Sequence, residues 1–171
     1  MSDRVIEIFQ EISHIPRCSY RAEQMREYLV GQIKHHDLEY QVDSAGNIAA
    51  RRGAPTVCLQ AHYDIVCIGR TDPVEVVEQE GYLRARESTL GADNGIGLAY
   101  MLALMEEGWE LEYLFTNDEE VGLVGARKLQ LQLQARYLIN TDTERECDIS
   151  IGCAGGYDMK AKLTLQRKPL P

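Results

Sequence analysis

Apolar residues recur with a helical period in three parts of the chain. The first part is residues 3–13, and this helix must end before Pro16, because the residue that precedes a proline avoids the α conformation. A second helix is predicted to begin near Ser19, a residue type that caps helices, and to end at residues 35–37. The clearest helix covers residues 95–107, which are apolar around most of the circumference, so this helix should be largely buried.

Short runs of β-branched and apolar residues predict strands between these helices. Residues 43–46 are turn formers between two such runs and predict a hairpin, and a second hairpin is predicted around residues 78–81. A crossover helix is predicted over residues 121–131. Alternation of strands and helices is typical of an α/β fold with a mostly parallel central sheet flanked by helices. The predicted strands are residues 38–42, 47–51, 56–61, 74–77, 82–85, 111–116 and 137–140.

Composition narrows the classes of function. The chain has 171 residues, of which 44% are hydrophobic and 26% charged, which is enough for one domain with a core. A net charge of −9 opposes binding to nucleic acid. No stretch is long and apolar enough to span a membrane, and the first ten residues have no apolar signal core, so we expect a cytoplasmic protein without a membrane partner. The five cysteines form no CxxC pair, and we expect reduced thiols rather than disulfides or a cysteine zinc finger.

Acidic residues and one histidine follow the predicted strands at the point where each strand ends. His62 and Asp64 follow one strand, residues 117–120 follow another, and Asp142 follows a third. Asp93 stands just before the buried helix. Because ligands of open α/β sheets bind beyond the carboxyl ends of the strands, we expect these side chains to share one edge of the sheet.

Carboxylates gathered at one place repel one another unless a cation lies among them. A divalent metal ion, or a pair of them, would remove this repulsion. Imidazole and carboxylate together suit Zn²⁺, and they also accept Mn²⁺ or Co²⁺.

The motifs that carry these residues resemble those of a known family, and the resemblance covers essentially the whole chain. The runs Ala-His-Tyr-Asp, Leu-Gly-Ala-Asp-Asn-Gly-Ile-Gly, Thr-Asn-Asp-Glu-Glu-Val-Gly and Asn-Thr-Asp-Thr-Glu occur in the order and context of the M20 metallopeptidases. Two runs, at residues 90–97 and at residues 152–156 (Gly-Cys-Ala-Gly-Gly), are similar to the aminoacyl-histidine dipeptidase branch, also called Xaa-His dipeptidases or carnosinase-like enzymes. The resemblance implies a zinc-peptidase-like catalytic domain that hydrolyses the peptide bond of small peptides.

The resemblance also implies a ligand set for two metal ions, most often Zn²⁺. It implies that His62 and Asp142 bind one metal ion, that Glu120 binds the other, and that Asp93 bridges both. These four residues are therefore the expected metal ligands.

Two further carboxylates receive catalytic roles from the same resemblance. Glu119 would be the general base that takes a proton from the attacking water, and Asp64 would hydrogen-bond the far ring nitrogen of His62 and fix its tautomer. The resemblance further implies a cis peptide bond between Asp93 and Asn94.

The chain departs from the family in one respect. The family takes a final histidine ligand from the far end of a longer chain, beyond a smaller domain that helps to bind substrate and to dimerise. We therefore expect residues 1–171 to be the N-terminal portion of a catalytic domain, with the lid or dimerisation domain and the C-terminal segment absent and a homodimer formed by the full-length relative. The other histidines, His14, His35 and His36, match no ligand of the family.

Three alternatives to a dipeptidase remain open. The first is a truncated chain that binds metal without catalysis, and the others are a related M20 tripeptidase and an N-acyl amino acid hydrolase. A serine hydrolase is disfavoured because the GxSxG motif is absent, and no cysteine has a partner histidine nearby in the sequence.

Overall fold

The computed structural model describes residues 2–143, 149–152 and 162. Within them the helices are α1 (Ser2–Ser13), α2 (Glu23–His35), α3 (Ala92–Glu106) and α4 (Val124–Arg127). The strands are β1 (Glu39–Val42), β2 (Ile48–Arg51), β3 (Val57–His62), β4 (Val76–Gln79), β5 (Tyr82–Ala85), β6 (Glu112–Thr116) and β7 (Tyr137–Asn140).

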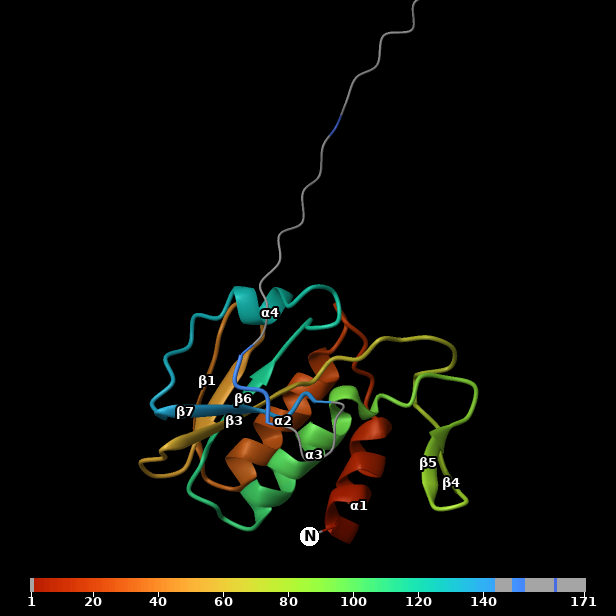
Figure 1. The fold of residues 1–171 in the computed structure, drawn as a ribbon, viewed down its shortest axis with the longest axis horizontal. Coiled ribbons are helices and arrows are strands. Elements are labelled where there is room, and N and C mark those ends of the chain that lie inside the picture. Colours follow the sequence, from red (N-terminus) through yellow and green to blue (C-terminus); the bar gives the residue numbers. More distant parts are fainter. Residues whose placement is uncertain (1, 144–148, 153–161, 163–171) are drawn as a thin grey trace, which may run out of the picture.

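A five-stranded sheet with the order β1-β2-β6-β3-β7 forms the centre of the described part of the chain (Figure 1). Strand β3 pairs in parallel with β6 on one side and with β7 on the other. The β1–β2 hairpin adds an antiparallel edge through the pairing of β2 with β6. The predicted α/β fold is confirmed, and its three parallel strands end at the same edge of the sheet.

The core lies between this sheet and the three long helices. Alternate residues of the central strands, such as Ile48, Ala61 and Phe115, are buried in one cluster with the apolar faces of α1, α2 and α3. Alternation places them on one face of the sheet. Helix α3 is apolar on most sides because it packs against both α1, which lies beside it in Figure 1, and β3.

The second predicted hairpin is confirmed as a separate unit, although its first strand is Val76–Gln79 rather than residues 74–77. Strands β4 and β5 pair with each other and form a two-stranded sheet that projects away from the central one (Figure 1). No helix in the described residues is long and apolar enough to cross a membrane.

The predicted start of the second helix was wrong. Ala22, not Ser19, occupies the N-cap position of α2, and no side chain caps this end. The Ser19 hydroxyl donates instead to Oδ2 of Asp64 at 2.7 Å. A hydroxyl can bond an acceptor that is distant in sequence as well as its own backbone, and the sequence shows only the second option.

The predicted crossover helix at residues 121–131 was also wrong in its extent, since α4 has only four residues. The segment after α4 alternates leucine and glutamine from Leu129 to Gln134, a period of two that does not suit a helix. Acidic side chains bind its backbone: the carboxylate of Asp43 accepts from the Gln130 amide, and the carboxylate of Glu112 accepts from the Gln134 amide.

The expectation of reduced thiols was wrong for two cysteines. Cys18 and Cys67 form a disulfide with a Cα–Cα distance of 5.5 Å, while Cys58 is free and buried. The two partners are 49 residues apart, and they meet because Cys18 pairs as a β-bridge with Ile65. Cysteine counting cannot detect such a long-range approach.

A buried asparagine links the β1–β2 turn to neighbouring segments at the same end of the sheet. The Asn47 side chain donates to the carbonyl of Gly125 at 2.9 Å and to the Asp43 carboxylate at 2.8 Å, and its oxygen accepts from the Asn117 amide at 3.2 Å. One side chain thus joins the β1–β2 turn, the start of α4 and the loop after β6.

Replacing Asn47 with alanine should lower the free energy of unfolding by about 2 kcal/mol, because the Asn117 amide would lose its partner and the Gly125 carbonyl would keep only the Lys128 amide. Urea denaturation followed by circular dichroism would measure the change. Gln41→Ala, on the exposed strand β1, is the control and should shift stability by less than about 0.5 kcal/mol. Equal stability of the two variants would contradict the role given to Asn47.

Candidate metal centre

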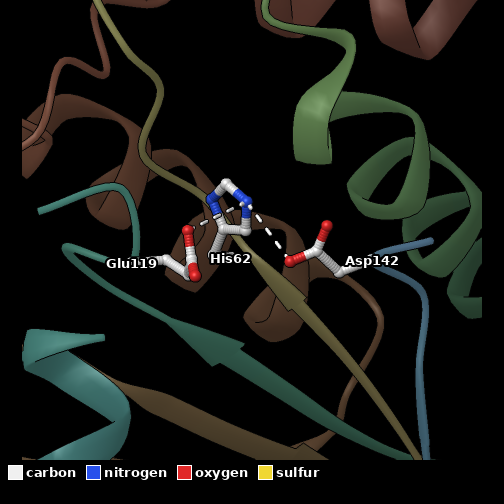
Figure 2. A group of neighbouring side chains, drawn as sticks. All are labelled: His62, Glu119 and Asp142. Carbon is white, nitrogen blue, oxygen red and sulfur yellow. Dashed lines mark ion pairs between the residues drawn. The ribbon is translucent and has the colours of Figure 1, made fainter. Parts of the chain in front are cut away.

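His62 is the buried centre of a group of acidic side chains. It is the last residue of β3, and its side chain is 1% exposed. Its Nε2 lies 3.1 Å from Oδ1 of Asp93, 3.8 Å from Oδ2 of Asp142 and 3.9 Å from Oε2 of Glu119. Figure 2 shows Glu119 and Asp142 on opposite sides of the imidazole ring.

Asp93 reaches the histidine from an irregular turn at the start of α3. Gly91 occupies the left-handed region at φ 71°, and Asp93 and Asn94 have non-helical backbone angles. The expected cis bond between Asp93 and Asn94 is confirmed. Asp93 is 64% exposed, so it forms the open side of the group above the buried imidazole.

Glu119 and Glu120 come from the loop that follows β6. Asp118 adopts a left-handed conformation with φ 52°, which turns the chain just before the two glutamates. The amides of Glu119 and Glu120 then donate to the two carboxylate oxygens of Asp64, at 3.0 and 3.4 Å. The Asp64 carboxylate therefore holds the backbone from which both glutamates extend.

Asp64 also lies against His62, with a contact that differs in detail from the expected one. The Nδ1 atom of His62 is 3.0 Å from the main-chain carbonyl of Asp64 and 3.5 Å from its carboxylate. The carbonyl therefore accepts the shorter hydrogen bond, and it fixes the ring so that Nε2 faces Asp93 and Asp142.

The charges of this group shift the pKa values of its members. Burial alone would lower the pKa of His62, but the hydrogen bond and charge of Asp64, helped by Asp93 and Asp142, raise it to about 9. Burial alone would raise the pKa of Asp64, yet its hydrogen bonds from His62, Glu119 and Ser19 hold it below the ordinary value. Burial, reinforced by neighbouring carboxylates, raises the pKa of Glu119 and of Glu120.

These side chains form two overlapping groups that could hold a metal ion. One group is His62, Glu119 and Asp142, and the other is His62, Asp93 and Glu120. In each group the candidate ligand atoms lie within 4.8 Å of one another. The structure thus brings together all five of the side chains expected to bind metal or to act as the base, and Asp64 lies directly behind them.

Two hollows adjoin this cluster. A hollow of about 420 Å³ next to Asp93 and Asp142 is bounded by Tyr100 and Ile96. A second hollow of about 270 Å³ lies next to Glu119 and has a mostly apolar lining that includes Leu123 and Leu138.

Comparison with known proteins identifies relatives of this arrangement. The chain is 40% identical over 185 aligned positions to the cytosol non-specific dipeptidase of Escherichia coli (strain K12). The chain is related to the M20 dipeptidases. The alignment covers 96% of this chain but only 38% of the E. coli dipeptidase, so the chain spans about two fifths of the length of that relative. No family model matches the chain.

Solved structures agree with this relationship to the M20 dipeptidases. The aminoacylhistidine dipeptidase of Vibrio alginolyticus has a TM-score of 0.76 and 30% identity, and the match covers 84% of this chain and 33% of that one. A tripeptidase of Staphylococcus aureus has a TM-score of 0.77 over 85% of this chain and 44% of its own, with 23% identity, and this likeness concerns the fold alone.

The sequence indicated most of this cluster but missed the residues that support it from behind. The sequence predicts Ser19 as a helix cap, and it does not single out Arg17 or Tyr20, because neither belongs to a recognisable motif. Arg17 can support the cluster from behind because it is buried, and burial of an arginine cannot be read from one sequence. The second dipeptidase-like run lies outside the described residues, apart from Gly152.

The raised pKa of His62 gives a test in the metal-free chain. NMR titration of the imidazole nitrogens should give a midpoint near 9 rather than 6.5. Protonated His62 should therefore stabilise the metal-free fold fully below pH 6.5, and this contribution should disappear as the pH rises through about 9. Asp64→Asn should move the midpoint down, because burial would then be less opposed.

His36 provides the internal control for that titration. Its pKa is lowered by burial and by the neighbouring charge of His35, and Asp64→Asn should leave it unchanged. A midpoint for His62 at or below 6.5 in the unsubstituted chain would contradict the electrostatic description of the cluster.

Proposed function

We propose that this chain is the metal-binding part of a peptidase that hydrolyses small peptides with the help of two divalent metal ions, with Zn²⁺ as the first choice. The observation that carries the proposal is the cluster itself. One buried imidazole and four carboxylates arrive from four separate segments, and the candidate ligand atoms of each group lie within 4.8 Å of one another.

The side chains present fit such ions. Nitrogen from His62 and oxygens from carboxylates are a donor set that zinc accepts. The cluster also attracts positive charge, since His62 retains its proton up to a pKa of about 9 and both glutamates have raised pKa values. A metal ion that displaced these protons would likewise offset the mutual repulsion of the carboxylates.

For the individual ligands, we propose the roles that the family resemblance implies. His62 and Asp142 would hold one ion, Glu120 would hold the other, and Asp93 would contact both. The proximity of Asp93 to His62 and its grouping with Glu120 support its place between the two sites.

Catalysis would then depend on the remaining acids. Metal ions bound in such a site polarise the peptide carbonyl and make water more acidic. Glu119, whose pKa is raised by burial, would accept the proton of the attacking water and pass it to the leaving amine. Asp64 would keep His62 in the orientation in which Nε2 faces the carboxylates.

A dipeptide is the substrate class that we propose. The names of two relatives describe dipeptidases, one of them an aminoacylhistidine dipeptidase. The hollow of about 420 Å³ beside Asp93 has the size of a site for a small molecule. Its aromatic and aliphatic walls, Tyr100 and Ile96, would contact the side chain of a short peptide.

We also propose a cytosolic location, because the E. coli relative is named as a cytosol dipeptidase. The Cys18–Cys67 disulfide is the feature that opposes it, since disulfides are rare in that compartment. Recovery of the protein from a secreted fraction of cells would contradict this location.

A second candidate function is metal binding without turnover. Among the four histidines of the chain, only His62 belongs to the two candidate ligand groups. Only one of the two sites would therefore have an imidazole ligand, and the site built on Asp93 and Glu120 would depend on carboxylates.

Substitution of the adjacent glutamates should separate their roles. Glu119→Gln should leave Zn²⁺ binding close to that of the unsubstituted chain and abolish any hydrolysis, because the amide has nearly the same shape but cannot accept a proton. Glu120→Gln should weaken one Zn²⁺ site by at least about tenfold, because a ligand charge is lost. Calorimetric titration of both variants would decide, and loss of Zn²⁺ binding in Glu119→Gln would instead make Glu119 a ligand.

The unsubstituted chain should bind Zn²⁺ unequally. We expect one tight site around His62, Asp93 and Asp142 and one weaker site, with weak or absent hydrolysis of a dipeptide. Calorimetry with Zn²⁺ followed by a dipeptide cleavage assay would measure both. Two equally tight sites with rapid cleavage would contradict the unequal assignment, and absence of Zn²⁺ binding would refute the metal centre.

A further inference from the structure

The segment of residues 17–20 runs directly behind the metal-ligand cluster. Its backbone pairs with the chain just beyond Asp64: the Ile65 amide donates to the carbonyl of Arg17 at 2.9 Å, and the Ser19 amide donates to the carbonyl of Ile65 at 3.3 Å. The disulfide from Cys18 to Cys67 joins the same two segments. Residues 17–20 therefore have a fixed place relative to the end of β3.

Ser19 connects this segment to the glutamates. Its hydroxyl donates to Oδ2 of Asp64 at 2.7 Å, and Asp64 is fully buried. The same carboxylate accepts the amides of Glu119 and Glu120. The Ser19 hydroxyl thus orients the carboxylate that holds the glutamate loop, and it shares Oδ2 with the Glu120 amide.

Arg17 connects the segment to the turn that carries Asp93. Its side chain is 2% exposed, and Nη2 donates to the carbonyl of Gly91 at 2.8 Å. A Cβ atom at Gly91 would come within 3.0 Å of Nη2, and one at Gly95 within 2.6 Å, so both glycines make room for the guanidinium. The Arg17 guanidinium therefore lies against both Gly91 and Gly95, the two glycines that flank the turn that carries Asp93.

Arg17 also brings a buried positive charge to the cluster. Burial lowers its pKa to about 10, and the charge of Asp64 opposes that change, so the guanidinium remains protonated at neutral pH. Its Nη1 atom has no hydrogen-bond partner within the part of the chain that the structure describes. A buried charge of this kind is costly unless its neighbours compensate for it, and Asp64 is the compensating neighbour.

Tyr20 makes the third connection. Its amide donates to Oδ1 of Asp118 at 2.6 Å, and both residues have left-handed backbones, with φ of 63° and 52°. Asp118 is the residue at which the chain turns towards Glu119. The segment thereby contacts the loop of the glutamates at a second point.

We propose that residues 17–20 act as a brace that positions the metal ligands, with Ser19 and Arg17 as its positioning residues. The proposal deepens the function proposed above and rests on it. The brace contacts the segments that carry Asp64, Asp93 and the two glutamates. The Thr141 amide, next to Asp142, donates instead to the carbonyl of Gln60 in β3, so this amide provides an internal reference, although the Thr141 hydroxyl also lies 3.5 Å from Oδ1 of Asn94.

The positioning role of Arg17 and simple electrostatics predict opposite changes in Zn²⁺ affinity when Arg17 is replaced. A positive charge near a metal site repels the metal, so removing the charge of Arg17 should tighten Zn²⁺ binding if charge alone mattered. If Arg17 acts by holding the Asp93 turn, its removal should weaken Zn²⁺ binding. The sign of the change therefore distinguishes positioning from repulsion.

The experiment compares paired variants of the full 171-residue chain. Ser19→Ala removes the hydroxyl and Ser19→Thr retains one, while Arg17→Met removes the charge and Arg17→Lys retains it. Ser44→Ala, which removes a hydroxyl remote from Asp64, is the control. The two measurements are calorimetric titration with Zn²⁺ and, without metal, hydrogen exchange of the amides of Glu119, Tyr20 and Thr141.

We expect Ser19→Ala to weaken Zn²⁺ binding by about tenfold and to speed exchange at Glu119, with Thr141 unchanged and with Ser19→Thr restoring both values. Arg17→Met should weaken Zn²⁺ binding by at least the same factor, and Arg17→Lys should recover most of the loss. Ser44→Ala should match the unsubstituted chain.

Two results would overturn the brace. One is unchanged Zn²⁺ affinity and unchanged exchange in Ser19→Ala, and the other is tighter Zn²⁺ binding in Arg17→Met. If Arg17→Met does not fold, Ser19→Ala with its threonine counterpart still decides the matter. Failure of the unsubstituted chain to bind Zn²⁺ would refute the proposed function instead, and the exchange rates would still show whether the brace holds the glutamate loop.

Discussion

Mutual repulsion among carboxylates is the constraint on which this structure depends. Asp93, Asp142 and Glu119 all approach one imidazole nitrogen within 4 Å, and Glu120 lies in the same cluster. Such a group is unfavourable by itself, and neighbouring carboxylates add to the effect of burial in raising the pKa of Glu119 and of Glu120. The fold must therefore hold these side chains in place by interactions made elsewhere, and the parallel strands do the first part of this work because their ends meet at one edge.

Buried polar groups also hold these acidic side chains in place, and Asp64 is central among them. It is fully buried, yet its pKa is lowered, because a hydroxyl, an imidazole and backbone amides all favour its charged form. A buried carboxylate with several donors is rigid, whereas an exposed one such as Asp93 can move to accommodate a ligand. The cluster thus combines a rigid buried part, formed by His62 and Asp64, with carboxylates that are open to solvent.

The sequence was most informative where one residue type has one use. Turn formers between apolar runs predicted the hairpins, hydrophobic period predicted α3, and the position of acids after strands predicted which side chains would gather around His62. It failed where a residue has several uses: Ser19 could cap a helix or bond a distant carboxylate, and only the folded chain shows which acceptor is near. The length of α4 was mispredicted for the same reason, since the distant side chains of Asp43 and Glu112 bind the backbone of the segment that follows it. Long-range contacts of this kind leave no local pattern.

The choice between a peptidase and a chain that only binds metal depends on how the two ion sites share their ligands. Metal affinity and catalysis make different demands on the same side chains: affinity rises with each charged donor, whereas catalysis also requires one carboxylate that remains free to take a proton. Glu119 lies within reach of His62 and Asp142, so it is placed to bind a metal ion. Its pKa is also raised, which favours a role as proton acceptor. The backbone of Glu119 is fixed by Asp64, but its side chain is about a quarter exposed and can turn towards metal or towards water. The same anchored amide and mobile carboxylate would let Glu119 accept a proton at one step and release it at the next, which a carboxylate held permanently by a metal ion could not do as readily.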